Sequence, residues 1–301
     1  RNEGMNPTVV MEFSVSRAAI FCGSQEVKAV LEKVTSEGNR EVWAMEEGGS
    51  VQEGEVCLSI RAPYSSFGLY ETAICGILAH STGWATGARD LIASANGIPV
   101  FCVGAHNVHP SVAPILDYAA VTGGCENGST VLGTKLVGSS PIASVSGALV
   151  QLFGDPVNAM AAYDRSMAPD VPRVGYVDPR GDIVAQTIEV ATLMKDHLDA
   201  IRLARIPGGM PVPLTIIQEV RNRLDALKFE HVRIVLSGDL TPERIRELVS
   251  GKAPVDAFHD SGYIASSVPI PFRPAIRTIS DRKVPQESVP PAPNPRLMRF
   301  L

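Results

Sequence analysis

Seven short apolar runs recur between residues 99 and 265, and most of them are separated by stretches with helical spacing. This alternation constrains the fold most, because strands that alternate with helices pair in parallel through right-handed crossovers. Seven such units suit an incomplete α/β barrel at least as well as an open doubly wound sheet. The expected strands are 99–104, 119–123, 135–138, 173–178, 200–203, 232–237 and 255–258. The expected helices include 110–118, 183–197, 213–227 and 241–249, the last capped by Thr241.

The region before residue 96 has a different pattern. Residues 9–16 alternate between apolar and polar as a half-buried strand does, and residues 24–35 have helical spacing. With further strands expected at 40–45 and 55–60, the pattern predicts an antiparallel sheet with a helix. A long helix should follow over about 67–95. The proline-rich tail after residue 284 predicts an extended segment and not a domain.

Composition and charge exclude several classes of protein. Of the 301 residues, 45% are apolar and 20% charged, as in ordinary folded proteins. A net charge of −5 without a strongly basic stretch argues against nucleic acid or a membrane as partner. Five cysteines without a CxxC pair predict buried free thiols and no zinc site. The sequence shows no signal peptide and no apolar run of about 18–20 residues, which predicts a cytoplasmic protein.

Polar residues follow or interrupt the expected strands. In barrels such residues form the active site, because the carboxyl ends of the strands open on one mouth. The candidates are His106, Asn107, His109, Asn127, Lys135, Asp178, Asp182, Arg202, Ser237, Gly238, Asp239, His259, Asp260, Ser261 and Gly262.

Several of these candidates have a structural alternative. The Ser237–Leu240 loop leads into a helix, so its N–H groups are suited to a phosphate, but an ordinary strand–helix junction has the same pattern. The same alternatives hold for 259–262. Lys135 and Arg202 interrupt apolar strands and must face the mouth, pair with an acid or reach water. Asp178 is a candidate ligand of magnesium or of a ribose hydroxyl, or else a helix cap.

A collinear set of short segments from about residue 9 to residue 275 resembles the nicotinate phosphoribosyltransferase family, the type II phosphoribosyltransferases that also include the quinolinate enzyme. The segments include Ala62-Pro63-Tyr64 to Phe67, Tyr70-Glu71-Thr72, Gly76-Ile77-Leu78, His109-Pro110, Gly123-Gly124, Lys135-Leu136, Gly154-Asp155, Val177-Asp178, Ile201-Arg202-Leu203 and Ser237-Gly238-Asp239-Leu240.

The resemblance implies a fold and a reaction. The fold is an irregular seven-stranded α/β barrel over 96–265 with an N-terminal α/β-sandwich region over 1–95. The C-terminal residues 266–301 are expected to belong to the N-terminal region. The protein is expected to be a homodimer with its active site near the subunit interface. The implied reaction transfers phosphoribosyl from phosphoribosyl pyrophosphate to nicotinate or a related aromatic base in NAD biosynthesis. Magnesium, and often ATP hydrolysis, accompanies it.

The resemblance also assigns roles to residues. It implies catalytic roles for Lys135, Asp178 and Arg202, with Asp178 as the candidate magnesium ligand. The implied substrate-binding residues are His106, Asn107, His109 and Ser144. The implied phosphate-binding residues are Ser237, Gly238, Ser261 and Gly262.

Several family positions are changed in this sequence. The family usually has two arginines shortly before the His-Pro, and this chain has His106 and Asn107 at those positions. Where the family has the histidine that ATP phosphorylates, this chain has Gly147. ATP coupling through that position is therefore chemically impossible. Ala204 replaces an aspartate, and Ala143-Ser144 replaces Gly-Thr. Asp239 replaces a glycine of the first phosphate loop, and His259-Asp260-Ser261-Gly262 replaces Gly-Val-Gly-Thr in the second.

Three hypotheses follow from these changes. The first is a divergent transferase, for nicotinate or for a base that lacks a carboxylate. The second is a catalytically degenerate homologue that binds a nucleotide or a partner subunit. The third is a different glycosyl or phosphate reaction on the same barrel, because a fold does not fix a function.

Overall fold

The computed structural model describes residues 5–238, 240–285 and 294–301. The chain divides into two compact units. The first comprises Arg1–Arg89, Thr122–Gly124 and Ser267–Leu301, and the second comprises Asp90–Val121 and Cys125–Ser266. Helix α3 (Glu71–Ala95) contributes residues to both units.

An antiparallel sheet forms the centre of the first unit. Among the described residues it has six strands in the order β12-β11-β1-β5-β3-β13. The central strand β1 (Thr8–Val15) pairs with β5 (Val56–Pro63) on one side and with β11 (Phe272–Ile279) on the other. The other strands are β3 (Glu41–Ala44), β12 (Arg282–Lys283) and β13 (Met298–Arg299), and a separate pair is formed by β2 (Ala19–Ile20) and β4 (Ser50–Val51).

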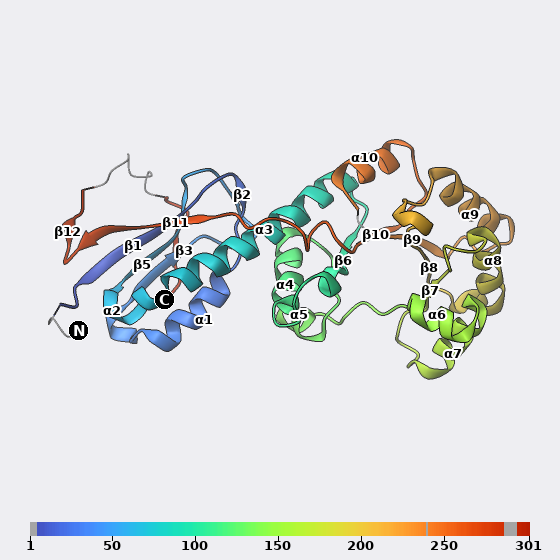
Figure 1. Cartoon of the computed structure of the whole chain (residues 1–301), viewed down its shortest axis with the longest axis horizontal. Helices are drawn as coiled ribbons and strands as arrows, with labels where there is room; N and C mark the ends of the chain where they lie inside the picture. The colour runs from blue at the N-terminus through green and yellow to red at the C-terminus, as the bar shows by residue number, and fades with distance from the viewer. Residues whose placement is uncertain (1–4, 239, 286–293) are drawn as a thin grey trace. The chain divides into compact units, whose positions relative to one another are not determined.

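The core of the first unit follows from the alternation along β1. Val9, Met11, Phe13 and Val15 are buried, and the residues between them are partly exposed. Helix α1 (Ser24–Val34) and the first turns of α3 cover one face of the sheet (Figure 1). The short elements η1 (Glu37–Asn39), α2 (Tyr64–Phe67) and η2 (Gly68–Tyr70) complete the unit.

A parallel sheet forms the centre of the second unit. Its five strands in the described residues are ordered β6-β10-β9-β8-β7. They are β6 (Val100–Cys102), β7 (Val174–Tyr176), β8 (Ala200–Leu203), β9 (Arg233–Gly238) and β10 (Ala257–Asp260). One residue from each strand packs into an apolar layer, formed by Phe101, Val174, Ala200, Val235 and Ala257. Such a layer on one face of a parallel sheet is typical of a barrel interior.

Helices surround this sheet in Figure 1. They are α4 (Ala113–Gly123), α5 (Val131–Leu136), α6 (Gly147–Phe153), α7 (Pro156–Ser166), α8 (Ile183–Met194), α9 (Leu214–Ala226) and α10 (Pro242–Ser250). Short 3-10 turns are η3 (Gly104–Asn107), η4 (Lys195–His197) and η5 (Pro207–Gly209). Thr241 caps α10 by accepting the Arg244 N–H at 3.2 Å, as predicted. The parallel sheet and the helices around it confirm the predicted α/β class.

Two of the seven expected strands are wrong. Residues 119–123 form the end of α4, and Lys135 lies in α5. Short apolar runs do not distinguish a strand from a buried helical turn, and Ala119 and Ala120 are buried in the helix. Thr130 begins α5 by accepting the Gly133 N–H at 3.1 Å, a start signal that the strand prediction overlooked.

Other expectations concern the tail, the cysteines and membrane spans. The described end of the tail pairs with β3 through β13, and residues 286–293 lie outside the described residues. All five cysteines are free, and four of them are buried. Among the described residues, every helix is too short or too polar to cross a membrane.

Candidate active site

Four side chains form the layer that follows the apolar one toward the carboxyl ends of the strands. Tyr176 pairs with Arg202, and His259 pairs with Ser237. Each lies two residues beyond a member of the apolar layer, so all four share its face of the sheet. The parallel strands therefore bring a cation, a hydroxyl, an imidazole and a phenol to one end of the barrel interior.

Arg202 carries the positive charge of this layer. Its Nη2 donates to the Val145 carbonyl oxygen at 2.9 Å, and its guanidinium carbon lies 4.9 Å from the centre of the Tyr176 ring. Its Nε is buried without a hydrogen-bond partner, and no carboxylate of the described residues forms an ion pair with it. Burial lowers the pKa of Arg202, yet an arginine keeps its proton in proteins. An uncompensated guanidinium of this kind attracts an anion.

His259 is neutral at physiological pH. It is 5% exposed, and its ring meets Phe101 edge-on with 5.1 Å between ring centres. Burial, and then the charge of Arg202, lower the pKa of His259 to about 4. The imidazole therefore offers one N–H donor and one acceptor nitrogen beside the arginine.

Tyr176 fills the space next to Gly147. A Cβ added at Gly147, the first residue of α6, would lie 3.1 Å from the Tyr176 ring and 3.3 Å from its hydroxyl. Position 147 is where the resemblance expects a histidine. In this chain a tyrosine ring from β7 occupies the room that such a side chain needs.

Asp178 is engaged by Arg180. The Arg180 Nε donates to both carboxylate oxygens of Asp178, at 2.9 and 3.1 Å, and this pairing holds the pKa of Asp178 below its usual value. The described residues contain no group of three side chains suited to a metal ion. Because Mg²⁺ prefers carboxylate oxygens that are free to coordinate, this arrangement does not fit a magnesium site on Asp178.

The two expected phosphate loops are held together by Asp260. This carboxylate is fully buried and accepts N–H groups from Leu240 at 3.4 Å, Gly262 at 3.4 Å, Tyr263 at 3.1 Å and Ile264 at 2.9 Å. The Ser261 N–H also donates to the Gly238 carbonyl oxygen at 2.9 Å. Amides that we expected to hold a phosphate thus bind an internal carboxylate. Asp239, the changed residue of the first loop, lies outside the described residues.

Two of the four expected substrate-binding residues, His106 and Asn107, lie in η3, and His109 and Ser144 lie in the loops before α4 and α6. His106 Nδ1 is 3.1 Å from the Val103 carbonyl oxygen, and Asn107 Nδ2 donates to the Ser261 carbonyl oxygen. His109 Nδ1 accepts the Ser111 N–H at 3.1 Å, which is a structural role. Ser144 is half-buried before α6. A cavity of about 350 Å³ lies beside this region, lined by Asn107, Thr241, Gly262, Tyr263, Ala265 and Ser266.

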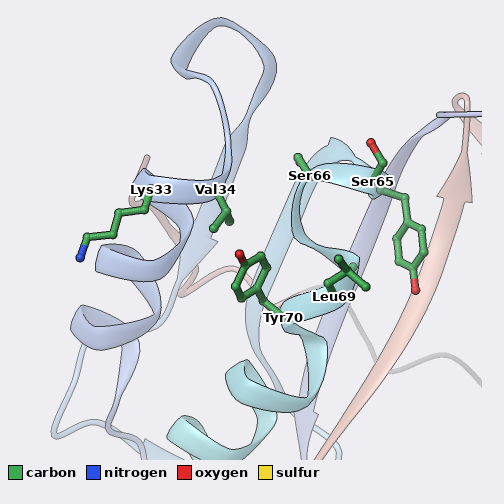
Figure 2. A pocket seen from close by; sticks show the side chains of 8 residues that line it. Lys33, Val34, Ser65, Ser66, Leu69 and Tyr70 are labelled. Atoms are coloured by element: carbon green, nitrogen blue, oxygen red, sulfur yellow. The ribbon is translucent and has the colours of Figure 1, made fainter. Parts of the chain in front are cut away.

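A second hollow lies in the first unit. It has a volume of about 610 Å³ and is formed by the end of α1 and by the segment from α2 to η2. Figure 2 shows Tyr70 extending toward Val34, while Lys33 points away from the hollow. The lining residues are Lys33, Val34, Tyr64, Ser65, Ser66, Gly68, Leu69 and Tyr70.

Comparisons with known proteins agree with this architecture. Residues 3–82 match the family model of the quinolinate phosphoribosyl transferase N-terminal domain. Nicotinate-nucleotide pyrophosphorylase from Pyrococcus furiosus is 31% identical, with a TM-score of 0.85, over 95% of this chain and 73% of that one. The chain belongs to the type II phosphoribosyltransferase family. The resemblance expected from the sequence segments is confirmed.

More distant members share the fold or part of the sequence. Human nicotinic acid phosphoribosyltransferase has a TM-score of 0.78 at 16% identity, over 97% of this chain and 74% of the human one. Nicotinate phosphoribosyltransferase pncB2 of Mycobacterium tuberculosis is 28% identical over 220 residues, which is 72% of this chain and 46% of that protein. The chain spans about half the length of the curated relatives it matches.

In this member of the type II phosphoribosyltransferase family, the expected site residues Lys135, Arg202 and Ser237 do not all converge. Arg202 and Ser237 share one face of the sheet, whereas Lys135 is exposed on α5. In Figure 1, α5 lies beside α4 at the β6 end of the sheet, three strands from β8. The catalytic role of Lys135 stays a prediction, and its expected place on a strand is wrong.

Sequence reasoning missed Tyr176 and the role of Asp260 in this family member. In the expected strand 173–178, Tyr176 lies two residues before the candidate Asp178 and so falls on the same face, which is a signal that the period of a strand provides. Asp260 is followed by Ser-Gly, a pattern typical of a carboxylate that accepts the next N–H groups.

Proposed function

We propose that this chain transfers phosphoribosyl from phosphoribosyl pyrophosphate to nicotinate or a related pyridine base in NAD biosynthesis. The observation that carries the proposal is the uncompensated Arg202 guanidinium in the barrel interior, one layer beyond a core built from all five parallel strands. Family membership supplies the reaction class, and the names of the relatives supply the base.

The layer around Arg202 is suited to anionic substrates. A guanidinium binds a carboxylate or phosphate through paired N–H donors, which strengthen where water is excluded. Ser237 and neutral His259 add hydrogen-bonding groups without adding charge. Among the four side chains of this layer, Arg202 therefore carries the net charge. We propose that Arg202 binds an anionic group of the substrate pair and that Ser237 and His259 orient the group.

Several finer points belong to the same proposal. The reaction does not depend on a phosphorylated protein histidine, because position 147 is glycine. The protein acts in the cytoplasm as a homodimer. Magnesium enters with phosphoribosyl pyrophosphate and not as a resident ion on Asp178, whose carboxylate is paired with Arg180.

The test is release of pyrophosphate from phosphoribosyl pyrophosphate in the presence of magnesium. Nicotinate, quinolinate and nicotinamide are compared as acceptor bases, with and without ATP. We expect turnover with a carboxylated base without ATP, and a loss of at least about 100-fold in kcat/KM in Arg202→Gln. Arg223→Gln, which removes an exposed guanidinium from α9, is the matched control. Failure of all three bases to release pyrophosphate would reject the transferase proposal.

A second candidate function is a catalytically degenerate homologue that binds a nucleotide or a partner subunit. The observation that favours it is Asp260, which accepts the N–H group of Gly262 in the second expected phosphate loop and the N–H groups of Tyr263 and Ile264 directly after it. Such a protein would bind nicotinate mononucleotide in calorimetry and release no pyrophosphate. Turnover with any base would exclude it.

A further inference from the structure

Among the described residues, no carboxylate forms an ion pair with Arg202. Buried arginines are normally paired with an acid, because removing a guanidinium from water is costly. The described acid that follows the adjacent strand β7 is Asp178, and its two oxygens accept from Arg180. The contacts that fix Arg202 are therefore the Val145 carbonyl oxygen and the ring face of Tyr176.

Tyr176 also lies against the first residue of α6. Gly147 leaves open the volume that the ring occupies, since a Cβ there would meet the ring at 3.1 Å. The ring is therefore close both to the start of α6 and to the guanidinium of Arg202 on β8. Val145, the acceptor of the Arg202 hydrogen bond, lies two residues before Gly147 in the same segment.

We propose that Tyr176 is a positioning residue that holds the Arg202 guanidinium in place of a carboxylate and so leaves its charge available to an anionic substrate. This inference rests on the proposed function. A carboxylate at this position would fix Arg202 equally well but would neutralise it, and the affinity for an anion would fall. An aromatic face stabilises the cation through its quadrupole and carries no net charge that competes with the ligand.

The side chain at position 176 determines the expected order of the variants in their affinity for inorganic pyrophosphate. Tyr176→Phe keeps the aromatic face and should leave anion binding within about twofold of the wild type. Tyr176→Leu removes the face and should weaken binding of inorganic pyrophosphate by about 3- to 30-fold. Tyr176→Glu supplies the carboxylate and should weaken it further. Tyr163→Leu, which removes a buried tyrosine ring from α7, is the control for a general loss of packing.

A double-mutant cycle separates positioning from packing. Calorimetric titration with inorganic pyrophosphate is run on the wild type, Tyr176→Leu, Arg202→Gln and the double variant. If Tyr176 acts through Arg202, Tyr176→Leu weakens binding only when Arg202 is present. An equal loss in both backgrounds, or no loss in Tyr176→Leu, overturns the inference.

Unfolding by urea gives a readout that does not need a ligand. The same four proteins are compared, and a Tyr176–Arg202 contact requires that the two single changes be non-additive. If the wild type binds neither pyrophosphate nor phosphoribosyl pyrophosphate, the proposed function fails while this cycle still decides the contact. Additive effects would overturn the inference, whatever the activity.

Discussion

The buried imidazole of His259 makes stability depend on pH. Its pKa is about 4 in the folded protein and ordinarily 6.5, so between these values the unfolded chain binds a proton that the folded chain does not. Stability supplied by this group is complete above pH 6.5 and is lost as the pH falls through 4. The loss is roughly 3 kcal/mol.

Urea unfolding at a series of pH values from 7 to 4 measures this dependence. We expect His259→Gln to flatten the decline between pH 6.5 and 4, whereas His231→Gln, at an exposed position, should leave it unchanged. A decline of the same slope in His259→Gln would mean that other groups cause it.

Asp260 is a second side chain with a measurable role. Removal of its carboxylate in Asp260→Ala leaves four N–H groups without their acceptor, which should lower the free energy of unfolding by about 2–4 kcal/mol. Because burial raises the pKa of Asp260, its contribution is greatest at low pH and decreases as the pH rises through that pKa.

Inorganic phosphate provides the complementary measurement. We expect phosphate to raise the melting temperature of Asp260→Ala more than that of the wild type, since the vacated amides would accept an external anion. Asp256→Ala, which removes a single backbone contact at the other end of β10, is the control. An equal response in all three proteins would show that Asp260 does not compete with phosphate.

Single residues were predicted from the sequence only where strand ends were correctly placed. Arg202 and Ser237 are such residues, because β8 and β9 begin and end close to the expected positions. Lys135 was misplaced because its helix was mistaken for a strand. Tyr176 looked like an ordinary strand residue, since a cation–π contact depends on a neighbouring strand and leaves no local pattern.

At the scale of elements, the contact between β7 and the start of α6 is sterically constrained. A side chain at position 147 meets the Tyr176 ring, so Gly147→Val should lower the free energy of unfolding by about 1–3 kcal/mol through overpacking. The same change in a Tyr176→Ala background should cost less, because the ring is gone. Chemical denaturation of the four proteins gives both values.

The control for this prediction is Gly154→Val. Gly154 follows α6 with φ of 83°, and no atom lies within 4 Å of a Cβ added there. Any cost at Gly154 therefore reflects backbone strain and should not depend on Tyr176. Rescue of Gly154→Val by Tyr176→Ala would contradict the steric explanation at Gly147.

The order of elements was largely predictable from the sequence, because apolar periodicity is a local property. Five of the expected strands in the second unit occur among the described residues, and the first unit has its predicted antiparallel sheet. The strand predictions for 119–123 and 135–138 were wrong, since a segment of four or five residues with only a few apolar ones fits either a strand or a helical turn. Strand order was not predictable, as it depends on contacts between distant segments.

For the whole molecule, the testable expectation is the oligomeric state. The chain has a mass of 32.1 kDa, so a homodimer would have a mass of about 64 kDa. Light scattering coupled to size-exclusion chromatography, over a range of concentrations and with and without phosphoribosyl pyrophosphate, measures it. A monomer under all these conditions would contradict the homodimer that we propose.

The pairing of β1 with β11 has a consequence for synthesis. About 260 residues separate the two strands, so at 5–20 residues per second β1 waits between about 13 and 50 s for this neighbour. During that time one edge of a largely apolar strand has no native partner, while all the strands of the parallel sheet are being synthesised. We therefore expect nascent chains that stop before residue 272 to need a chaperone more than the finished protein does.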